Sequence, residues 1–243
     1  LVGSEMCIRD RRWTLRLHSR RHEDLFLLDR RDPAWYRNDH LSHSHGVALE
    51  YSPQFASFGA TAGLEGLYET LDSSNLGDRS RRIGAFYAEI EPDFGDRLEA
   101  SVGFRTQVVQ GESPIFSPSV GASLQLWEDW RLRASAGYAC RPPSFTELYY
   151  TSPANIGEPN LKSEKSLSYE AGLDGKIGPV SLQTTLFLRR EWDIIDWVRA
   201  ASGEPWRAVN HGEAETYGVE TGVGVNPSKA WGLPAVKEVS VGY

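Results

Sequence analysis

The chain has 243 residues, a formal net charge of −7 and a sequence pI near 5.4. An acidic balance does not favour nucleic-acid binding, which needs a basic surface, and two cysteines, Cys7 and Cys140, are too few for a disulfide scaffold. The mean hydropathy is −0.43, and no run approaches about 20 apolar residues. The sequence therefore excludes a bundle of membrane helices, but not a membrane β-barrel, whose strands are half polar.

The first dozen residues do not resemble part of a folded domain. Residues 1–12 lack the charged-then-apolar layout and the small-residue cleavage site of a secretory signal. They resemble translated adaptor sequence, so we expect a non-native or unstructured N-terminal segment there and leave residues 1–10 out of the fold prediction. Residues 13–243 contain no linker or low-complexity run, and we expect them to be one domain of a longer protein.

Alternation of apolar and polar residues is the main structural signal. Strands are expected over residues 11–20, 23–29, 44–52, 56–69, 81–91, 97–109, 116–127, 129–140, 164–174, 179–190, 207–225 and 235–243. The pattern is clearest in 97–108 and 129–140, where even positions are mostly apolar and odd positions mostly polar or charged. Because strand side chains switch faces at every residue, each segment has one apolar and one polar side.

These strands are long enough to cross a bilayer. Leu98 to Val108 spans ~33 Å at ~3.3 Å per residue. At a tilt of ~40° it projects to ~25 Å, the height of the apolar band of an outer-membrane barrel. Strands of soluble proteins are commonly about 5–6 residues long. The length and pattern together predict a wall with lipid on one side and water on the other.

The register of residues 129–140 has an energetic check. A slip by one residue would turn Arg131 and Arg133 toward lipid, at a cost of ~2–4 kcal/mol each near the midplane. In the favoured register both arginines face the wet side. Trp130 and Tyr138 then lie on the lipid side, far enough apart to mark the two interfacial aromatic girdles.

The connections alternate in length. Short turns are expected near 53–55, 92–96, 127–129, 174–179 and 226–234, and longer polar loops near 30–43, 70–80, 110–115, 141–163 and 191–206. Short turns at one end and long loops at the other are typical of an up-and-down membrane barrel. We therefore predict an all-β fold, a transmembrane antiparallel up-and-down β-barrel.

Three segments carry a family resemblance. They are residues 138–149 (YACRPPSFTELY), residues 157–172 (GEPNLKSEKSLSYEAG) and residues 210–220 (NHGEAETYGVE). In this order and spacing they resemble signatures of TonB-dependent outer-membrane receptors. The matching positions are Arg141, Pro143, Glu147, Leu148, Gly157, Pro159, Leu161, Glu164, Ser166, Glu170, Gly172, Asn210, Gly218 and Glu220. Glu158, Ser163 and Cys140 depart from the usual pattern.

We interpret these motif residues as structural. Pro142 and Pro143 lack an N–H and end a strand at the membrane rim, Arg141 and Glu147 pair or line the mouth, and Glu170 and Glu220 face inward. The resemblance implies a barrel of about 22 strands, with an N-terminal plug domain and a TonB box. This chain shows neither, and about twelve strands, so we expect an incomplete barrel over 13–243 with the plug domain absent.

The resemblance also implies a function. The implied function is that of an outer-membrane receptor of a Gram-negative bacterium, which would bind a scarce nutrient chelate, siderophore-iron or cobalamin, and import it with energy supplied by TonB. The implied partners are the TonB complex, acting through the missing plug domain, the chelate and outer-membrane lipid. No enzyme activity, cofactor or nucleic acid is expected.

Aromatic and arginine residues gather in the long loops. Rings beside guanidinium groups suit a rigid, partly anionic ligand such as a metal chelate. The candidate ligand-binding residues are Trp35, Tyr36, Arg37, Arg141, Phe145, Tyr149, Tyr150, Trp206 and Arg207, with Trp192, Trp197 and Arg199 near the last two. Interfacial anchoring is the alternative role for several of these rings.

Other chemistry is weakly supported. A solvated loop is the favoured reading of His40, His43 and His45, and the spacing of Asp72, Asn75 and Asp78 matches no established calcium loop, so no metal site is expected. A barrel enzyme of phospholipase or protease type needs a nucleophile beside a histidine, and no such motif adjoins the isolated His18, His22 and His211. A passive porin is the remaining alternative, with about 16–18 strands.

Overall fold

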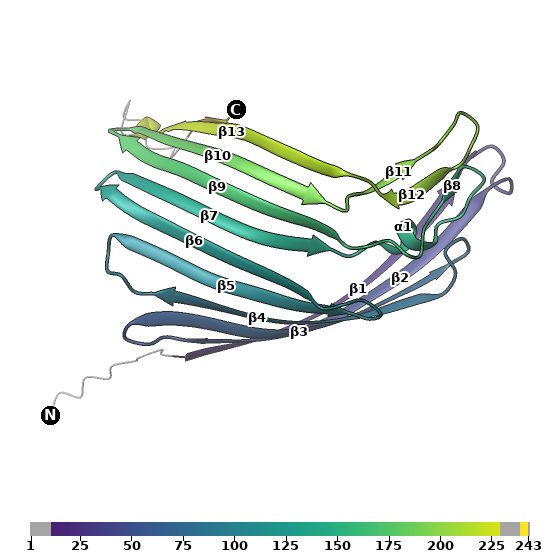
Figure 1. Cartoon of the computed structure of the whole chain (residues 1–243), viewed down its shortest axis with the longest axis horizontal. Coiled ribbons are helices and arrows are strands. Elements are labelled where there is room, and N and C mark those ends of the chain that lie inside the picture. The colour runs from purple at the N-terminus through teal and green to yellow at the C-terminus, as the bar shows by residue number, and fades with distance from the viewer. Residues whose placement is uncertain (1–10, 229–238, 243) are drawn as a thin grey trace.

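The computed structural model describes residues 11–228 and 239–242. Eleven strands form one antiparallel sheet in the order β1-β2-β3-β4-β5-β6-β7-β9-β10-β13-β14, and three short strands form a second sheet in the order β11-β12-β8 (Figure 1). The elements are β1 (Arg11–Leu27), β2 (Arg37–Pro53), β3 (Phe58–Ser73), β4 (Arg79–Pro92), β5 (Leu98–Val109), β6 (Ile115–Trp127), β7 (Trp130–Arg141), α1 (Phe145–Tyr149), β8 (Asn155–Ile156), β9 (Glu164–Ile177), β10 (Val180–Trp192), β11 (Ile195–Val198), β12 (Trp206–Asn210), β13 (Glu213–Val225) and β14 (Val239–Gly242). Over these residues, no helix has the length and apolar character that crossing a membrane requires.

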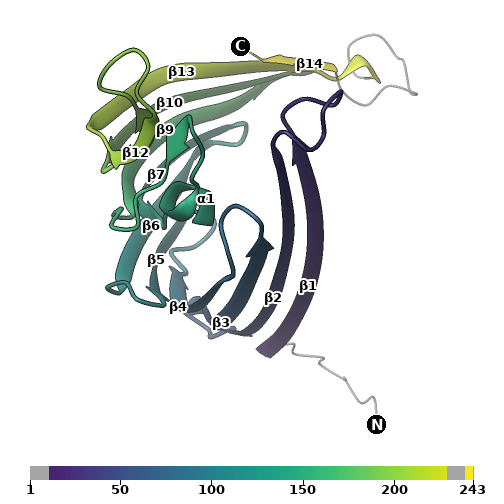
Figure 2. The same cartoon turned by 90° about the vertical axis from the view of Figure 1, so that its right-hand side faces the viewer.

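The large sheet is strongly curved. Figure 2 shows it as an open trough, with β1 and β14 toward its two edges and α1 inside the curve. Each strand pairs with the strand before and after it, apart from β8, β11 and β12, which lie in the connections. The described strands therefore form an incomplete barrel of up-and-down topology, as predicted, with eleven strands in the wall against about twelve expected.

Contacts with the α1 segment identify the concave face of the wall. Arg81 of β4 donates from Nη1 to the carbonyl oxygen of Pro143 at 2.8 Å, and the Arg79 guanidinium lies 4.0 Å from the centre of the Tyr149 ring. The odd positions of β4 thus point inward. Since side chains alternate, the pairing registers place Arg105 of β5 and Arg133 of β7 on the same concave side.

Ion pairs cross neighbouring strands on this concave face. Arg81 contacts Glu69 at 2.7 Å, and Arg105 contacts Glu65 at 2.7 Å. Further along the wall, Arg133 reaches Asp174 at 3.2 Å. A Cβ at Gly172 would lie 2.6 Å from Cζ of Arg133, so the guanidinium can cross β9 to reach Asp174 only because residue 172 has no side chain. The charges are thereby paired on the wet side.

The convex face is apolar and exposed. Across the wall it presents Leu15, Leu49, Leu64, Phe86, Val102, Val120, Leu132, Leu186 and Val219. Within the described ranges the buried apolar side chains are few: Leu71, Leu76, Ala85, Val109 and Ala208. A soluble domain of this size would turn such a set inward. The sheet turns it outward, as expected of a wall whose convex side meets lipid.

The predicted register of β7 is confirmed. Arg131 and Arg133 lie on the concave face, where Arg131 is 3.6 Å from Glu99. Trp130 and Tyr138 share the convex face at opposite ends of the strand. A Cβ at Gly175 would lie 2.5 Å from the Trp130 ring, so this glycine lets the indole lie flat against β9.

The strand boundaries near the N-terminus correct the prediction. Residues 11–20 and 23–29 are not two strands, because Arg21 and His22 continue the ladder opposite His43 and Ser42. Arg11 and Arg12 already pair within β1, while residues 1–10 lie outside the described residues. The β2 strand begins at Arg37, so the expected loop 30–43 contracts to residues 28–36. The three histidines 40, 43 and 45 thus belong to a strand and not to a solvated loop.

A second correction concerns residues 191–225. The expected strand 207–225 is broken at His211 and Gly212, where the glycine has φ +71°, and β12 before the break joins the small sheet. The expected loop 191–206 contains β11. The loops predicted near 70–80 and 110–115 shorten to residues 74–78 and 110–114, so lengths alternate less regularly than expected. Of the strand predicted over 235–243, only β14 lies within the described residues.

The two faces of β7 give a direct test of the wall. Ala134 (convex) and Ser135 (concave) are neighbours halfway between Trp130 and Tyr138. Ala134→Arg should destabilise the protein folded in lipid vesicles by ~2–4 kcal/mol, because it forces a charge into the apolar band. Ser135→Arg, which faces water, should change it by less than about 1 kcal/mol. Denaturant titration of the intact protein in vesicles measures both, and equal effects would contradict the two-sided wall.

Candidate functional site

The long connections meet at one end of the wall, which we call the loop end (residues 28–36, 74–78, 110–114, 142–163 and 193–212). Figure 1 shows α1, β8, β11 and β12 gathered there, and Figure 2 places α1 inside the curve. Most candidate ligand-binding residues belong to these segments. The opposite end carries the shorter turns 54–57, 93–97, 128–129 and 178–179, together called the turn end.

The α1 segment begins with a capping box. The Ser144 Oγ accepts from the backbone N–H of Glu147, and the Ser144 N–H donates to Oε2 of Glu147 at 2.6 Å. Pro142 and Pro143 precede it and cannot continue the β7 ladder. Together they turn the chain from the wall into a short helix. The family-motif proline and glutamate thus act here through backbone geometry.

Arg141 fastens this helix to the wall. Its two Nη atoms donate to the Glu147 carboxylate at 2.9 and 3.0 Å, and its Nε donates to Oε2 of Glu164 at 2.5 Å. The other oxygen of Glu164 accepts the backbone N–H of Ile195 at 2.7 Å. One guanidinium therefore joins the end of β7, α1, the start of β9 and, through Glu164, the start of β11.

The electrostatics of Glu147 follow from this clamp. Burial alone raises the pKa of its carboxyl, but the hydrogen bonds from Arg141 and Ser144 more than offset this effect. The net pKa of Glu147 lies below its ordinary value of 4.5. The carboxylate is therefore ionised under all ordinary conditions and keeps its bidentate partner.

Rings and cations line the inner side of α1. The Arg81 guanidinium lies 5.0 Å from the centre of the Phe145 ring, and Arg79 lies over Tyr149. The Tyr150 hydroxyl is 3.3 Å from that of Tyr36, and the Tyr150 ring meets Trp197 edge to face at 6.5 Å. Three loops of the sequence thus converge on Tyr150.

Two backbone-level contacts complete the loop end. The Nδ2 of Asn210 donates to the carbonyl oxygens of Lys162 and Asp193, and its Oδ1 accepts the Lys162 N–H at 2.8 Å. Gly157 packs against α1 so closely that a Cβ would lie 2.8 Å from the Glu147 carbonyl oxygen. The motif asparagine and glycine therefore hold the 142–163 and 193–212 connections together.

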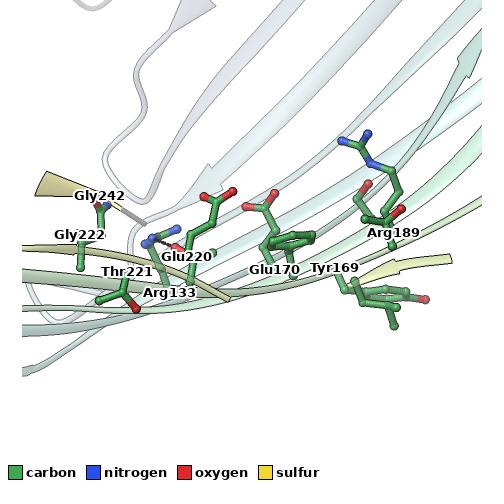
Figure 3. Close-up of a pocket in the computed structure, with 14 residues that line it drawn as sticks. Arg133, Tyr169, Glu170, Arg189, Glu220, Thr221, Gly222 and Gly242 are labelled. Carbon is green, nitrogen blue, oxygen red and sulfur yellow. Dashed lines mark hydrogen bonds between the residues drawn. The ribbon is translucent and has the colours of Figure 1, made fainter. Parts of the chain in front are cut away.

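Of the other motif residues, Leu148, Pro159 and Leu161 lie in the 142–163 connection, and the rest lie in the wall. Gly218 sits under the Phe187 ring, where a Cβ would come within 2.7 Å, and Ser166, Glu170 and Glu220 lie on the concave register. Figure 3 shows Arg133, Glu170, Arg189 and Glu220 on one side of the sheet and Tyr169 on the other. Arg133, Glu170, Arg189 and Glu220 line a concave cavity of about 780 Å³ on β7, β9, β10 and β13.

Not every predicted ligand residue joins the cluster around α1. Arg37 pairs with Asp39 at 2.8 Å on β2, and Trp35 is 68% exposed in the 28–36 loop. Trp206 lies beside Arg199, whose Cζ is 4.8 Å from the ring centre, and Arg207 is exposed. Apart from Trp35, the predicted rings therefore form two groups, one around α1 and one at β12.

A second concave cavity, of about 610 Å³, lies between β1, β2, β3 and α1. It is lined by Phe145 and Tyr150, which the sequence singled out, but also by Arg20, His22 and Arg81, which it did not. The sequence does contain the information needed to find Arg20 and His22. On a single strand these two residues share a face, and His22 then lies opposite Ser42. Finding them required joining the two predicted strands 11–20 and 23–29 into one.

Among residues 11–228 and 239–242, no group of three or more His, Cys, Asp or Glu side chains could hold a metal ion. His43 and His45 stack with ring centres 6.1 Å apart on the convex face of β2, and His40 faces inward to Ser73. Asn75 donates to the Thr151 carbonyl oxygen at 2.6 Å.

The close contact at Gly157 yields a stability prediction. Gly157→Ala should destabilise the intact protein by about 1–3 kcal/mol, because its Cβ meets rigid backbone atoms of α1. Gly84→Ala is the matched control, since a Cβ there meets nothing within 4 Å. That control should be neutral within about 1 kcal/mol. Denaturant unfolding compares the two variants, and equal losses would refute the tight packing of Gly157.

The depressed pKa of Glu147 yields a pH prediction. The ionised carboxylate stabilises α1 above pH 4.5, and this contribution is lost as the pH falls through the lower pKa of the folded state. Hydrogen exchange of residues 142–150, corrected for the intrinsic rate, should therefore accelerate as the pH falls below 4.5. Glu147→Gln should already exchange fast at pH 6 and respond less to acid, whereas the exposed Glu204→Gln should behave as the parent. An acid response retained in full by Glu147→Gln would contradict the clamp.

Comparison with known proteins accords with this architecture. The family described as TonB dependent receptor-like, beta-barrel matches residues 9–243. The vitamin B12 transporter BtuB of Vibrio vulnificus (strain YJ016) is 33% identical over 87 residues, which make up 36% of this chain and 14% of that relative.

Two solved structures share the fold. The siderophore receptor PirA from Pseudomonas aeruginosa has a TM-score of 0.71 at 16% identity over 96% of this chain and 48% of its own. A ferric enterobactin receptor mutant from the same organism, PfeA with enterobactin, has a TM-score of 0.69 at 17% identity, over 88% and 38%. The chain thus spans about half the length of these receptors or less. The resemblance read from the three motifs is confirmed, and the chain belongs to the TonB-dependent receptors, a family of receptors and transporters rather than enzymes, with its described strands forming part of the family's β-barrel.

Proposed function

We propose that the chain forms part of an outer-membrane receptor of a Gram-negative bacterium that imports a scarce nutrient chelate, siderophore-bound iron or cobalamin. The observation that carries the proposal is the family match over residues 9–243, together with relatives named as a vitamin B12 transporter and siderophore receptors. The apolar convex face supports the membrane location. Energy would come from TonB through a plug domain of the whole receptor.

The loop end supports a chelate as the ligand. Arg79 and Arg81 lie over the rings of Tyr149 and Phe145 on the concave side, and Arg199 lies beside Trp206. Such pairs offer a flat face and a positive charge together, which suits a rigid, partly anionic complex. Trp206 is 39% exposed, which leaves part of its ring accessible to a ligand.

Two alternatives receive less support. An enzyme needs an accessible nucleophile positioned by a base. Ser73 Oγ lies 2.7 Å from His40 Nδ1, but this hydroxyl is buried and accepts the backbone N–H groups of Asn75 and Leu76, so it caps the 74–78 loop and is not presented to a substrate. A passive porin needs no clamp of the kind that Arg141 makes with Glu147 and Glu164. Both alternatives also lie outside the receptors that this chain resembles.

The import proposal is tested in a strain that lacks the chromosomal receptor gene. The full-length gene is returned, and accumulation of ⁵⁵Fe-enterobactin, other ⁵⁵Fe-siderophores and ⁵⁷Co-cyanocobalamin is measured with and without TonB. Accumulation of one labelled chelate that depends on TonB supports the proposal. Accumulation that is equal without TonB would identify a porin, and accumulation of none of the chelates would remove the nutrient-chelate assignment.

Ring removal at the loop end should weaken binding of the accumulated chelate. In the full-length receptor, Tyr149→Ala and Trp206→Ala should each raise its Kd roughly tenfold, since a partly desolvated cation–π pair contributes about 1–2 kcal/mol. Trp127→Ala at the turn end, 68% exposed in this structure, is the matched control and should bind as the parent does. Equilibrium binding to purified receptor measures all three. An unchanged Kd would take that residue out of the ligand site.

A further inference from the structure

The convex face has a sharp boundary on β3. Phe58 and Tyr68 share that face, and Phe58 stacks on Phe55 of the adjoining turn with ring centres 4.5 Å apart. The strand between them spans ~33 Å, or ~25 Å after a tilt of ~40°, which equals the height of the apolar band. Tyr68 therefore lies where the apolar band ends, on the side of the loop end.

A row of polar and cationic side chains runs along this boundary. His45 of β2, Tyr68 of β3 and Arg82 of β4 face one another in register on the convex side. The Arg82 guanidinium lies 5.9 Å from the centre of the Tyr68 ring. His45 Nδ1 is 3.0 Å from the Ser19 Oγ, which fixes the imidazole. One row further toward the loop end lie Arg21 and His43.

Arg82 differs from the arginines of the concave wall. Arg81, Arg105 and Arg133 each lie within 3.2 Å of a carboxylate oxygen, and Arg21 is paired with Glu23. Arg82 is exposed and makes no ion pair with any residue in the described ranges. Its guanidinium thus presents its donors outward, at the depth where lipid headgroups begin.

Beneath this row the wall is hollowed. The next convex row holds Val47, Gly66 and Gly84, and a Cβ at Gly84 would meet nothing within 4 Å. The hollow measures about 550 Å³ and extends from His45 and Arg82 to Val47. On the side toward the turn end, the convex face continues as rows of apolar side chains. A lipid acyl chain that occupies the hollow therefore continues into the hydrocarbon region of the bilayer. The cationic row and the hollow together form what we call the Arg82 surface.

We propose that the Arg82 surface binds a phosphorylated lipid of the leaflet on the side of the loop end. The phosphate accepts from Arg82 and from the free Nε2 of His45, while an acyl chain fills the space that Gly66 and Gly84 leave open. A planar guanidinium offers paired donors to phosphate oxygens, and an aromatic ring at the interface holds it in place. The inference rests on the proposed membrane location but not on the transported ligand.

The test uses the purified full-length receptor in detergent and native mass spectrometry. Diphosphorylated lipid A, its dephosphorylated form and inorganic phosphate are the probes. The parent should retain the phosphorylated lipid, and Arg82→Gln should lower its affinity roughly tenfold through loss of a charge-assisted hydrogen bond. Arg97→Gln, at another exposed arginine on the turn end, should retain it. Gly84→Leu, which fills the hollow but keeps Arg82, should also lose lipid.

Several results would overturn the lipid site. They are equal retention of phosphorylated and dephosphorylated lipid, displacement by an equal concentration of inorganic phosphate, or full binding by both Arg82→Gln and Gly84→Leu. Fractionation of the parent with outer-membrane vesicles is measured first, so a failure of the membrane location is distinguished from a failure of the site. Chelate uptake by Arg82→Gln should remain unchanged, because the surface faces away from the concave wall.

Discussion

The structure depends on the separation of polar and apolar side chains onto opposite faces of one sheet. Every residue step along a strand reverses the side on which the side chain lies, so a charge in the wrong register would be buried in lipid at a cost of ~2–4 kcal/mol. Arg81, Arg105 and Arg133 obey this constraint by reaching carboxylates on neighbouring strands. Glycines such as Gly172 leave room for those long side chains. The curvature of the wall then encloses the charged side.

The loop end solves a different problem, which is to hold irregular chain over the mouth of the wall without a hydrophobic core. Few apolar side chains of the described residues are buried, and several of those, among them Val109 and Leu76, lie at this end. Polar links do most of the fastening instead. Arg141 satisfies two carboxylates, and Glu147 also accepts a backbone N–H at the cap of α1. Satisfied networks of this kind fix geometry where packing is thin.

How far the sequence predicts this structure differs between wall and loops. The alternation in 97–108 and 129–140 gave the correct faces because each residue reports its side independently of the rest of the chain. The predicted strand boundaries are wrong where the alternation is interrupted although the chain does not turn. Arg21 and His22 place polar side chains on both faces of the strand, yet they continue β1 because β2 supplies hydrogen-bonding partners opposite them. The small sheet of β8, β11 and β12 could not be predicted from the sequence, because strands of two to five residues are too short to show an alternation of apolar and polar side chains.

The loop-end cluster was only partly predictable for the same reason. The motif residues Arg141, Glu147 and Glu164 were found by resemblance, and the predicted pairing of Arg141 with Glu147 is confirmed. The further bond from Arg141 to Glu164 depends on how residues 142–163 fold back. Tyr36 and Tyr150 are far apart in the chain and meet only because their loops converge at one end. Arg79 and Arg81, which lie over Tyr149 and Phe145, carry no loop signal because they belong to a strand.

The asparagine that bridges two connections has a consequence for engineering. Because Asn210 bonds backbone atoms of both Lys162 and Asp193, the 142–163 and 193–212 segments share one hinge of polar contacts. Transplanting either segment alone onto another barrel would remove two of the three hydrogen bonds of this amide, both of them to Lys162. Loop exchange aimed at a new specificity should therefore move the two segments as a cassette.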